Sequence, residues 1–369
     1  MDKEKARQHL YDQVFLPALA EQVSALVHFF ERNQEQLAAE FIESFRDICI
    51  RIAAMQQFQE KAPIGFIHYS MLRTSVLERA HTYLIEAYSD HWYWDREACY
   101  ARYDAGWALQ GASNLIERLE ERRPKYMGVL HPADVEYMVL QHLDCFTQFV
   151  TALMRLAMPQ AVRLPEYQNI KKANRLRIRI GELMDISEDV HVEDCVRKKE
   201  KEAKRLLSEQ GSACAYESFA GIRLSSIVVK EMDLRYSNFS ESDLMAAAFH
   251  SCVLIGTNWN GSVLHRADFS NSLLHDADFR GCDLRGAIFT RVNGQQQEEG
   301  FHRLPGLLGV RFTNADLEGA VFTDARLYGA DFRGANLRNA VFLQKDRERY
   351  RLSPEQIAAI SWIDGSRED

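Results

Sequence analysis

Residues 267–291 read ADFSNSLLHDADFRGCDLRGAIFTR, five consecutive units of five residues with a bulky apolar residue in the third place of each. The same period runs without a miss from Phe219 to Phe289 and resumes from Leu307 to Phe342. Two places before each bulky residue the chain prefers a small one. A period of five fits neither a helix, at 3.6 residues, nor an ordinary strand, at 2.0. It predicts a chain that turns a corner every five residues and points one large and one small side chain inward per unit.

These units resemble the A(D/N)LxX motif of the pentapeptide-repeat family, as in Ala330-Asp331-Phe332-Arg333-Gly334. The resemblance covers about residues 217–343, or some twenty-three units. It implies a right-handed, four-sided β-helix with four units in each coil. The predicted fold class is therefore α + β, a mainly helical N-terminal domain followed by this β-helical solenoid and a C-terminal capping helix.

The bulky residues themselves support a four-sided winding, because they alternate between aromatic residues and Leu almost throughout. Every fourth unit then repeats the residue type, which predicts two aromatic columns inside the solenoid. The first column consists of Phe219, Phe239, Trp259, Phe279, Phe312 and Phe332. The opposite column consists of Val229, Phe249, Phe269, Phe289, Phe322 and Phe342. The alternation survives the break in phase if Leu307 follows Phe289, so thirteen extra residues are predicted to loop out within about 292–304.

Two neighbouring sides of the predicted rod carry apolar residues in outward positions. Their centre consists of Ile288, Leu273, Val321 and Tyr328. A solitary solenoid would not need such a patch. It serves either as a surface for a partner or a second copy, or as the place where the chain's own helical half docks. The sequence leaves both open.

The predicted loop offers a second set of candidate partner-binding residues. It is polar, bounded by glycines, and consists of Asn293, Gly294, Gln295, Gln296, Gln297, Glu298, Glu299 and Gly300. A loop that projects from a rigid scaffold is a common place for binding residues. The alternative is a neutral insertion, which surface loops tolerate because closure entropy grows slowly with length.

The chain divides into four predicted parts. They are a helical domain at 1–165, a basic strand or hairpin with a linker helix at 166–216, the repeats at 217–343, and a capping helix with a tail at 344–369. One predicted helical stripe consists of Leu72, Val76, Tyr83 and Leu84. Ser353-Pro354-Glu355-Gln356 has the pattern of a capping box and predicts a short helix over 354–363 that covers the last coil.

Residues 175–180 alternate Arg with Leu and Ile, which predicts a strand with one basic face. With residues 184–192 it is expected to form a hairpin beside the first coil of the solenoid. A basic strand followed by the Lys/Arg-rich residues 197–205 is compatible with nucleic acid. Acidic residues interleave this second group, which favours a solvated linker helix, and we expect no direct contact with nucleic acid.

No motif for catalysis, a cofactor or a metal is evident, so neither an enzyme nor a cofactor is predicted. His142 and Cys145 lie three residues apart on an apolar helix, where both are expected to be core residues. The seven cysteines are scattered without a Cys-x-x-Cys pair, which is typical of reduced thiols in a cytoplasmic protein. No run of eighteen apolar residues occurs, so no membrane span is expected.

The family resemblance implies a non-enzymatic protein that binds another protein. Members that confer antibiotic resistance act on a bacterial type II topoisomerase, DNA gyrase or topoisomerase IV, with a rod that resembles duplex DNA. Here residues 217–343 carry fifteen acidic and twelve basic residues, and a strong DNA mimic should be more negative. The alternative is a two-domain adaptor in which the helical half and the rod bind different partners. The sequence also leaves a homodimer open.

Overall fold

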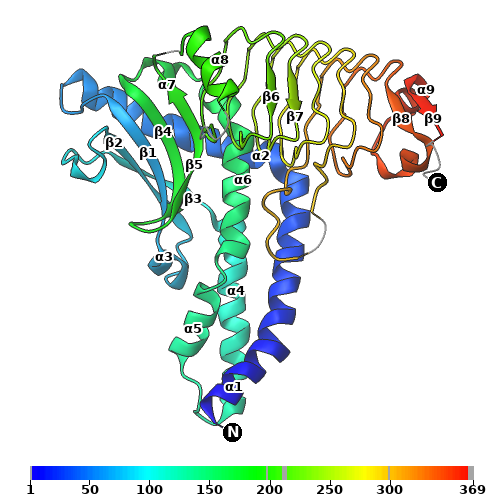
Figure 1. The fold of residues 1–369 in the computed structure, drawn as a ribbon. Coiled ribbons are helices and arrows are strands. Elements are labelled where there is room, and N and C mark those ends of the chain that lie inside the picture. The colour runs from blue at the N-terminus through cyan, green and yellow to red at the C-terminus, as the bar shows by residue number, and fades with distance from the viewer. Residues whose placement is uncertain (1, 197, 210–213, 298–299, 365–369) are drawn as a thin grey trace. The chain divides into compact units, whose positions relative to one another are not determined.

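The computed structural model describes the 369-residue chain except residues 1, 197, 210–213, 298–299 and 365–369. It divides into two compact units (Figure 1). The first consists of Met1–His191 with Gly300–His302, and the second of Val192–Glu299 with Arg303–Asp369.

The first unit is built on long helices. They are α1 (Lys3–Leu10), the π-helical turn Tyr11–Phe15, α2 (Leu16–Gln57), α3 (Arg73–Leu77), α4 (Gly106–Arg122), α5 (Pro132–Leu140), α6 (Asp144–Ala161) and α7 (Pro165–Asn169). On α2 a stripe that includes Phe41, Phe45 and Ile48 is fully buried. By length and composition alone the helical run Lys3–Gln57 could also cross a membrane, where the sequence predicted no such span; buried core helices pass the same test.

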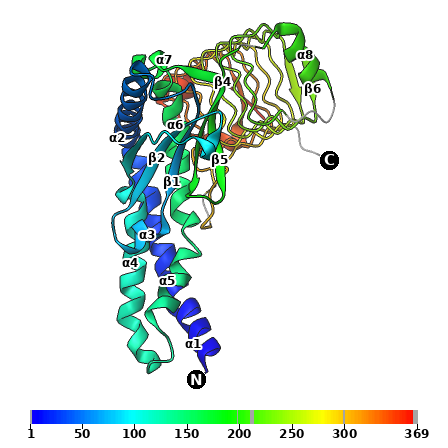
Figure 2. The same cartoon turned by 90° about the vertical axis from the view of Figure 1, so that its left-hand side faces the viewer.

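The same unit contains a five-stranded mixed sheet in the order β3-β2-β1-β4-β5 (Figure 2). The strands are β1 (Ile64–Met71), β2 (Thr82–Ser89), β3 (Tyr100–Asp104), β4 (Lys172–Glu182) and β5 (Ser187–Asp194). The central β1 runs antiparallel to β2, with Tyr69 opposite Ile85, and parallel to β4, with Tyr69 opposite Ile180. Residues more than 100 positions apart in the sequence therefore pair side by side.

This sheet corrects parts of the predicted organisation. The mainly helical domain predicted at 1–165 also contains strands β1, β2 and β3, and the predicted helical stripe through Tyr83 and Leu84 is wrong, because these residues lie in β2. Along β2 the buried residues alternate with half-buried ones, the period of a strand. The basic hairpin is confirmed as β4 and β5, but it pairs with β1 instead of lying beside a coil. The boundary at 165/166 is therefore also wrong.

The second unit winds with a period of twenty residues. Parallel bridges join residues one coil apart, such as Asp243 with Val263 and Val263 with Asp283. In the first aromatic column, from Phe219 to Phe332, successive ring centroids lie 4.4–5.7 Å apart. In the second, from Phe249 to Phe342, they also lie 4.4–5.7 Å apart. Both predicted columns are confirmed, and Figure 1 shows the successive turns of this β-helical rod.

The insertion has the predicted length but a different position. Bridges span twenty residues at Leu273–Asn293 and thirty-three at Asp278–Arg311, so thirteen residues are extra. The wall continues through Gln296, whose backbone N–H donates to the Tyr328 carbonyl. Residues 297–309, and not 292–304, form the insertion.

Gly294, and not Leu307, occupies the inward position between Leu274 of the preceding coil and Leu327 of the following coil. A Cβ atom on Gly294 would lie 2.5 Å from Cγ2 of Val310 and 3.0 Å from Cδ2 of Leu327. Val310 holds the small-residue position of its unit, two places before Phe312, and it is larger than Ala, the commonest residue at that position. The extra bulk of Val310 therefore leaves no room for a side chain at residue 294.

Both ends of the coil are covered. At the start, α8 (Glu200–Ser208) packs Ala203 and Leu207 against the core, so this predicted solvated linker is an amphipathic cap. At the end the capping box of Ser353 and Gln356 is confirmed on α9 (Pro354–Ala359), but the helix stops there. Residues Ser361–Ile363 instead form β9, which pairs in parallel with β8 (Val341–Leu343). The remaining short elements of the second unit are β6 (Val228–Lys230), β7 (Ala248–His250) and the 3-10 turn η4 (Gln344–Arg349); the first unit also has the 3-10 turns η2 (Trp92–Trp94) and η3 (Arg123–Tyr126).

Candidate interaction surface

One side of the rod aligns apolar outward residues in successive coils, and we call this set the apolar column. It consists of Val228, Ala248, Ile288, Val321 and Val341, joined by parallel bridges and interrupted by Asp268. Val228 is 55% exposed, and the others are half-buried because each packs on its neighbour in the next coil. The coil geometry therefore brings Ile288 and Val321 of the predicted patch directly together.

The other two predicted patch residues lie on the adjoining side. Leu273 is 37% exposed and stands in the ladder between Val253 and Asn293. Tyr328 is half-buried, and its hydroxyl accepts a hydrogen bond from Nη1 of Arg349 at 2.6 Å. Tyr328 is therefore part of a polar network instead of an open apolar surface.

The insertion is anchored to the wall by a buried carboxylate. Asp276, 5% exposed, accepts hydrogen bonds from the backbone N–H groups of Gly306 (2.6 Å), Leu308 (2.8 Å) and Gly309 (3.1 Å). Nε2 of Gln296 donates to the Leu307 carbonyl at 2.9 Å. Residues 306–309, which we call the second arm of the insertion, are thus fixed in place, because hydrogen bonds to a charged acceptor are stronger than hydrogen bonds to a neutral one.

The predicted glutamine cluster is divided by this arrangement. Gln295 is exposed on the wall, Gln296 is half-buried against the second arm, and the Gln297 N–H donates to the Gly306 carbonyl at 3.0 Å. Glu298 and Glu299 lie outside the described residues. Of the described members of the loop prediction, only Gln295 presents its side chain freely, so the loop is not a row of projecting polar groups.

Comparison with protein families supports the repeat directly. Residues 247–286 and 307–342 match the family of pentapeptide repeats in eight copies. The rod is built of pentapeptide repeats. No curated protein is similar enough to the chain to count as a match.

Several solved pentapeptide-repeat structures are similar to part of the chain. Trypsin-treated QnrB1, a plasmid-mediated fluoroquinolone resistance protein, is 17% identical with a TM-score of 0.26, over 40% of this chain and 66% of QnrB1, just under two thirds of its length. Rfr23 from the cyanobacterium Cyanothece 51142 is 19% identical with a TM-score of 0.21, over 32% of this chain and 86% of Rfr23. HetL from Nostoc sp. strain PCC 7120, involved in the regulation of heterocyst differentiation, is 20% identical with a TM-score of 0.19, over 34% of this chain and 76% of HetL.

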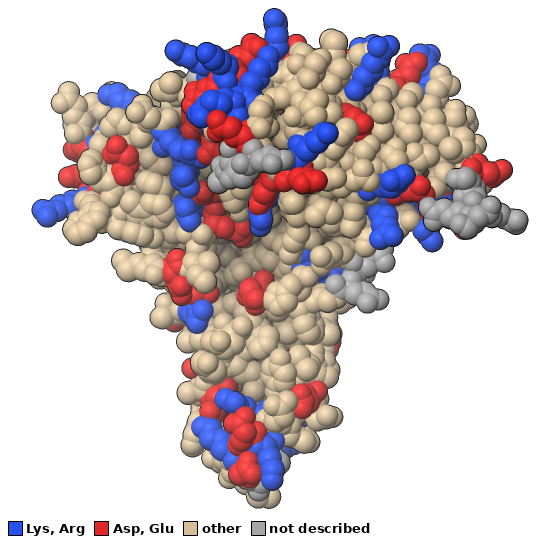
Figure 3. Space-filling view, in the orientation of Figure 1, with Lys and Arg blue, Asp and Glu red and all other residues tan. Residues whose placement is uncertain are grey.

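Charges on the pentapeptide-repeat rod are largely paired with one another. In the unit pattern Asp-x-Arg the two side chains form ion pairs, at 2.6 Å for Asp233–Arg235 and 2.7 Å for Asp283–Arg285. Figure 3 shows blue and red atoms next to each other on the face in view instead of a field of one sign. Paired carboxylates present little net negative potential, which argues against mimicry of DNA.

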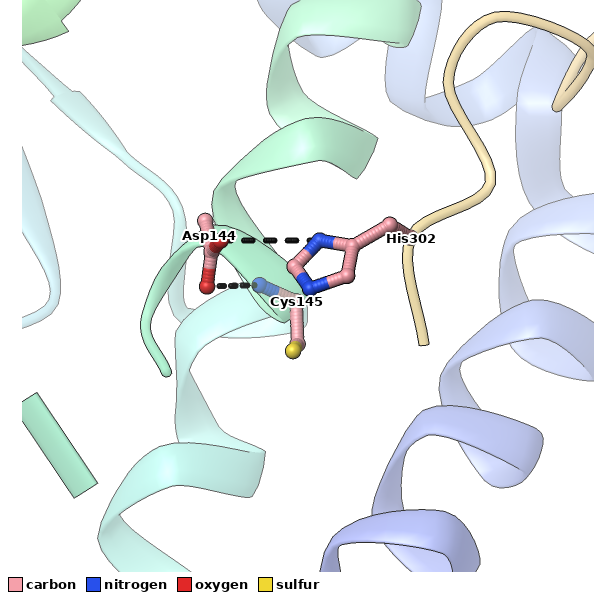
Figure 4. A group of neighbouring side chains, drawn as sticks. All are labelled: Asp144, Cys145 and His302. Carbon is pink, nitrogen blue, oxygen red and sulfur yellow. Dashed lines mark hydrogen bonds and ion pairs between the residues drawn. The ribbon is translucent and has the colours of Figure 1, made fainter. Parts of the chain in front are cut away.

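The tip of the insertion, Gly300–His302, belongs to the first unit. Figure 4 shows the Asp144 carboxylate facing the His302 ring, with Oδ2 3.5 Å from Nδ1. Nε2 of Gln148 donates to the carbonyls of Cys145 (2.9 Å) and Phe301 (2.5 Å). Residues 300–302 are therefore held to the start of α6 by the Gln148–Phe301 hydrogen bond, with the Asp144 carboxylate next to the His302 ring.

Asp144, Cys145 and His302 also have ligand atoms within 4.8 Å of one another. The chemistry of the set fits a metal poorly. Burial raises the pKa of the Cys145 thiol to about 12, so a metal would first have to displace a strongly held proton to bind the thiolate. The Asp144 and His302 side chains are both 63% exposed. The contact between Asp144 and His302 explains why their side chains lie together without a bound metal ion.

The other reactive groups are engaged in structure. Nδ1 of His142 contacts the Met138 carbonyl at 2.9 Å and Nε2 contacts the Tyr11 hydroxyl at 3.2 Å, so His142 does not activate Cys145. Cys252 and Cys282 are buried in the small slots of the rod, where burial raises both thiol pKa values. Along β4, Arg177 and Arg179 pair with Asp189 of β5 at 2.9 and 3.2 Å, which reduces the predicted basic face.

Sequence reasoning missed two functional features of the rod. The anchoring role of Asp276 depends on N–H groups thirty residues away, and no local pattern indicates it. The pocket beside Tyr328 depends on residues from three successive layers of the coil. The one available signal was Arg291, which has Phe289 and not an acidic residue two places before it; Arg326 follows Asp324 in an Asp-x-Arg pattern and gave no such signal.

Proposed function

We propose that this chain is a non-enzymatic binding protein whose pentapeptide-repeat rod contacts a protein partner through the apolar column. The observation that carries the proposal is the alignment of Ile288, Val321 and Val341 in adjacent coils. A strip of apolar side chains on a rigid β-surface can form hydrophobic contacts with a partner. Because the rod is already ordered, it loses little conformational entropy on binding. We also infer the right-handed, four-sided winding of the family and a cytoplasmic location.

The first partner class to test is a bacterial type II topoisomerase, DNA gyrase or topoisomerase IV. The support for it is the repeat itself, together with the resemblance to the resistance members of the family. Because the rod's charges are paired, contact with such an enzyme would rest on apolar and shape complementarity and not on a negative field. Salt dependence should then be shallow, in contrast to binding that neutralises phosphate-like charge.

A direct binding assay with purified gyrase, together with a supercoiling assay with and without a poison, tests the proposal. Ile288→Glu and Val321→Glu place charges in the apolar column and should weaken binding at least tenfold, about 1.4 kcal/mol. Val263→Glu is the matched control, because Val263 is 38% exposed and its ladder neighbours are Asp243 and Asp283. Equal binding by all four proteins, or no binding at micromolar concentration, would exclude gyrase as the partner of this surface.

A second candidate function, the two-partner adaptor, is favoured by large apolar side chains that are exposed on the first unit. Trp94 is 88% exposed, and Met184 and Ile186, at the tip of the β4–β5 hairpin, are 80% and 85% exposed. Large apolar side chains at such exposure are typical of contact residues. Ile186→Glu should then abolish binding of one partner and leave binding through the apolar column unchanged. Sedimentation of the same variants tests whether either surface joins two copies of this chain.

A further inference from the structure

A pocket of about 510 Å³ opens on the wall of the rod, next to the C-terminal turn. Its lining comes from three layers: residues 291–293 of one coil, residues 324–326 and Tyr328 of the next, and Lys345, Asp346 and Arg349 of η4. The volume falls within the range of about 300–1,000 Å³ that is common for small-molecule sites. None of these residues belongs to the apolar column.

The acidic groups of this pocket are already neutralised. Asp346 is 5% exposed, and Oδ1 accepts hydrogen bonds from Nη1 of Arg349 at 3.1 Å and from the Tyr328 hydroxyl at 3.4 Å. Oδ1 of Asp324 lies 3.6 Å from Nζ of Lys345. Each carboxylate therefore has a cation beside it, and neither makes the pocket negative.

Two arginines at the pocket have no such partner. Within the described part of the chain, Arg291 and Arg326 form neither an ion pair nor a side-chain hydrogen bond. The Arg291 N–H donates to the Thr323 carbonyl, and Arg326 is bridged to Asn293, so the two residues start from adjacent coils. Adjacent strands lie about 4.8 Å apart, which lets both guanidinium groups reach one small ligand.

The side chain of Asn293 provides an independent indication of a ligand. Its Oδ1 atom is fully buried and has no hydrogen-bond partner among the described residues, although it lines the pocket. A buried amide oxygen left without a partner costs free energy unless a bound group or water satisfies it. Oδ1 accepts hydrogen bonds, so it can take one from a hydroxyl group of a ligand, such as the P–OH of hydrogen phosphate, while the arginines contact the anionic oxygens.

We propose that this pocket binds a doubly charged oxyanion, a phosphate or a dicarboxylate, between Arg291 and Arg326. A guanidinium group presents two parallel N–H donors that match the spacing of two oxygens of a carboxylate or phosphate. The two guanidinium groups at the pocket carry two positive charges, so a ligand with about two negative charges would neutralise them. The inference does not depend on the proposed protein partner, because the apolar column lies elsewhere on the rod wall.

Titration calorimetry of the full chain at low salt tests the proposal with three probes: inorganic phosphate, succinate and a capped hexaglutamate peptide. We expect one site, with affinity at least tenfold weaker in the Arg291→Gln/Arg326→Gln double variant. Asp324→Asn releases Lys345 from its pair and should strengthen binding. Arg285→Gln, an exposed arginine paired with Asp283 on another side of the rod, is the matched control and should bind like the parent protein.

The three probes also distinguish the source of the anion. Binding of phosphate or succinate without the peptide supports a free small molecule, and binding of the peptide supports an acidic protein segment; both agree with the proposal. The proposal is overturned if no probe binds at 10 mM, or if the double variant binds as well as the parent protein. It is also overturned if Arg285→Gln loses as much affinity as the double variant. Thermal unfolding of each variant shows that the loss does not come from misfolding.

Discussion

The rod and the sheet of the first unit both bury large apolar side chains, but they differ in how far apart in the sequence the contacting residues lie. In the rod the stacking partner of Phe269 is Phe289, twenty residues along, and the same step repeats in every coil except across the insertion, where Phe289 stacks on Phe322. In the sheet Tyr69 of β1 lies beside Ile180 of β4, and Nε2 of Gln56 donates to the Lys171 carbonyl, 115 residues away. A fixed local step leaves a visible period in the sequence, whereas long-range pairing leaves none.

The two regions also differ in what they bury. The regular coils of the rod bury two aromatic columns with small residues between them, and the rod's buried charged residues Asp276, Asp278, Arg311 and Asp346 lie beside the insertion or in the C-terminal turn. The first unit buries a charged pair, Lys61 and Asp95, whose side chains are 0% and 5% exposed. Mutations can therefore test whether the regular region depends on packing and the irregular one on specific polar contacts.

The largest expected effect is Trp259→Ala in the middle of the first aromatic column. Trp259 is fully buried, stacks on Phe239 at 4.4 Å and on Phe279 at 5.7 Å, and donates from Nε1 to Oγ1 of Thr257. Loss of the indole should cost about 3–5 kcal/mol. At about 2–4 °C per kcal/mol, the rod's melting temperature should fall by roughly 10 °C in calorimetry.

The control for this variant is Trp94→Ala, because the Trp94 side chain is 88% exposed and its removal should change stability by no more than about 0.5 kcal/mol. If the two regions unfold independently, Trp259→Ala lowers one calorimetric transition and leaves the other in place. A single transition that moves as a whole would instead show that the two regions unfold together. The difference between them would then concern their sequence patterns and not their stability.

A slightly smaller loss is expected for Lys61→Ala in the first unit. Nζ of Lys61 donates to Oδ2 of Asp95 at 2.9 Å and to the Glu97 carbonyl. Without Lys61 a buried carboxylate is left unpaired, which should cost about 3 kcal/mol in urea unfolding. Adding Asp95→Asn removes that charge and should restore part of the loss; no restoration would show that the ion pair is not the cause.

The comparison for the buried pair is an exposed one in the same unit. Arg118 and Glu21 lie 2.6 Å apart, with side chains 45% and 63% exposed. Arg118→Ala should therefore cost less than about 1 kcal/mol, because solvent screens an exposed pair. A cost equal to that of Lys61→Ala would contradict the role assigned to burial.

One buried charge cluster exists in the rod as well, and its effect should depend on pH. Burial raises the pKa of Asp278, but Arg311 and Arg280 lower it more, to about 2. Because this pKa lies below the unfolded value of 3.8, the stabilisation is present above pH 4 and is lost as the pH falls toward 2. Asp278→Asn should remove about 2 kcal/mol at pH 7 and flatten the acid limb. Asp243→Asn, at a half-exposed position of the rod, should leave that limb as it is.

The smallest effect tests the one irregular place in the rod. Gly294→Ala puts a methyl group 2.5 Å from Cγ2 of Val310, and such overpacking should cost about 1–2 kcal/mol. Val310→Ala removes the opposing methyl groups, so the double variant should be more stable in urea than Gly294→Ala alone. A double variant no better than the single one would show that the clash is not what keeps residue 294 a glycine.

The sequence predicted the rod in detail because every unit repeats the same local rule. The two aromatic columns and the capping box at Ser353 were both found in the structure, and so was the length of the insertion. Its position was not, because the choice between Gly294 and Leu307 for one slot depends on the size of Val310, a contact across coils. In the first unit the alternation of Tyr83, Ile85 and Ala87 was a strand signal that a helical interpretation of Tyr83 and Leu84 overlooked.

The candidate surfaces follow the same rule. Ile288 and Val321 could be predicted as neighbours, because the coil repeats them on one side. The anchoring of the insertion by Asp276 and the pocket around Arg291 and Arg326 could not, because both combine residues from layers that the insertion displaces in sequence. Periodic features of this chain were therefore predictable from the sequence, whereas features that interrupt the period depend on contacts between coils that the sequence does not reveal.

The short strand at the end of the chain limits how such rods can grow. β9 is hydrogen-bonded to β8, and Trp362 lies over Phe342 with ring centroids 5.8 Å apart. Within the described residues, the strand edge on that side is the three residues of β9, which is too short to template the end-to-end polymerisation that open sheet edges invite. Evolution or design can therefore lengthen the rod only by inserting coils in its interior. Each block of twenty residues would add one coil and leave the caps at both ends unchanged.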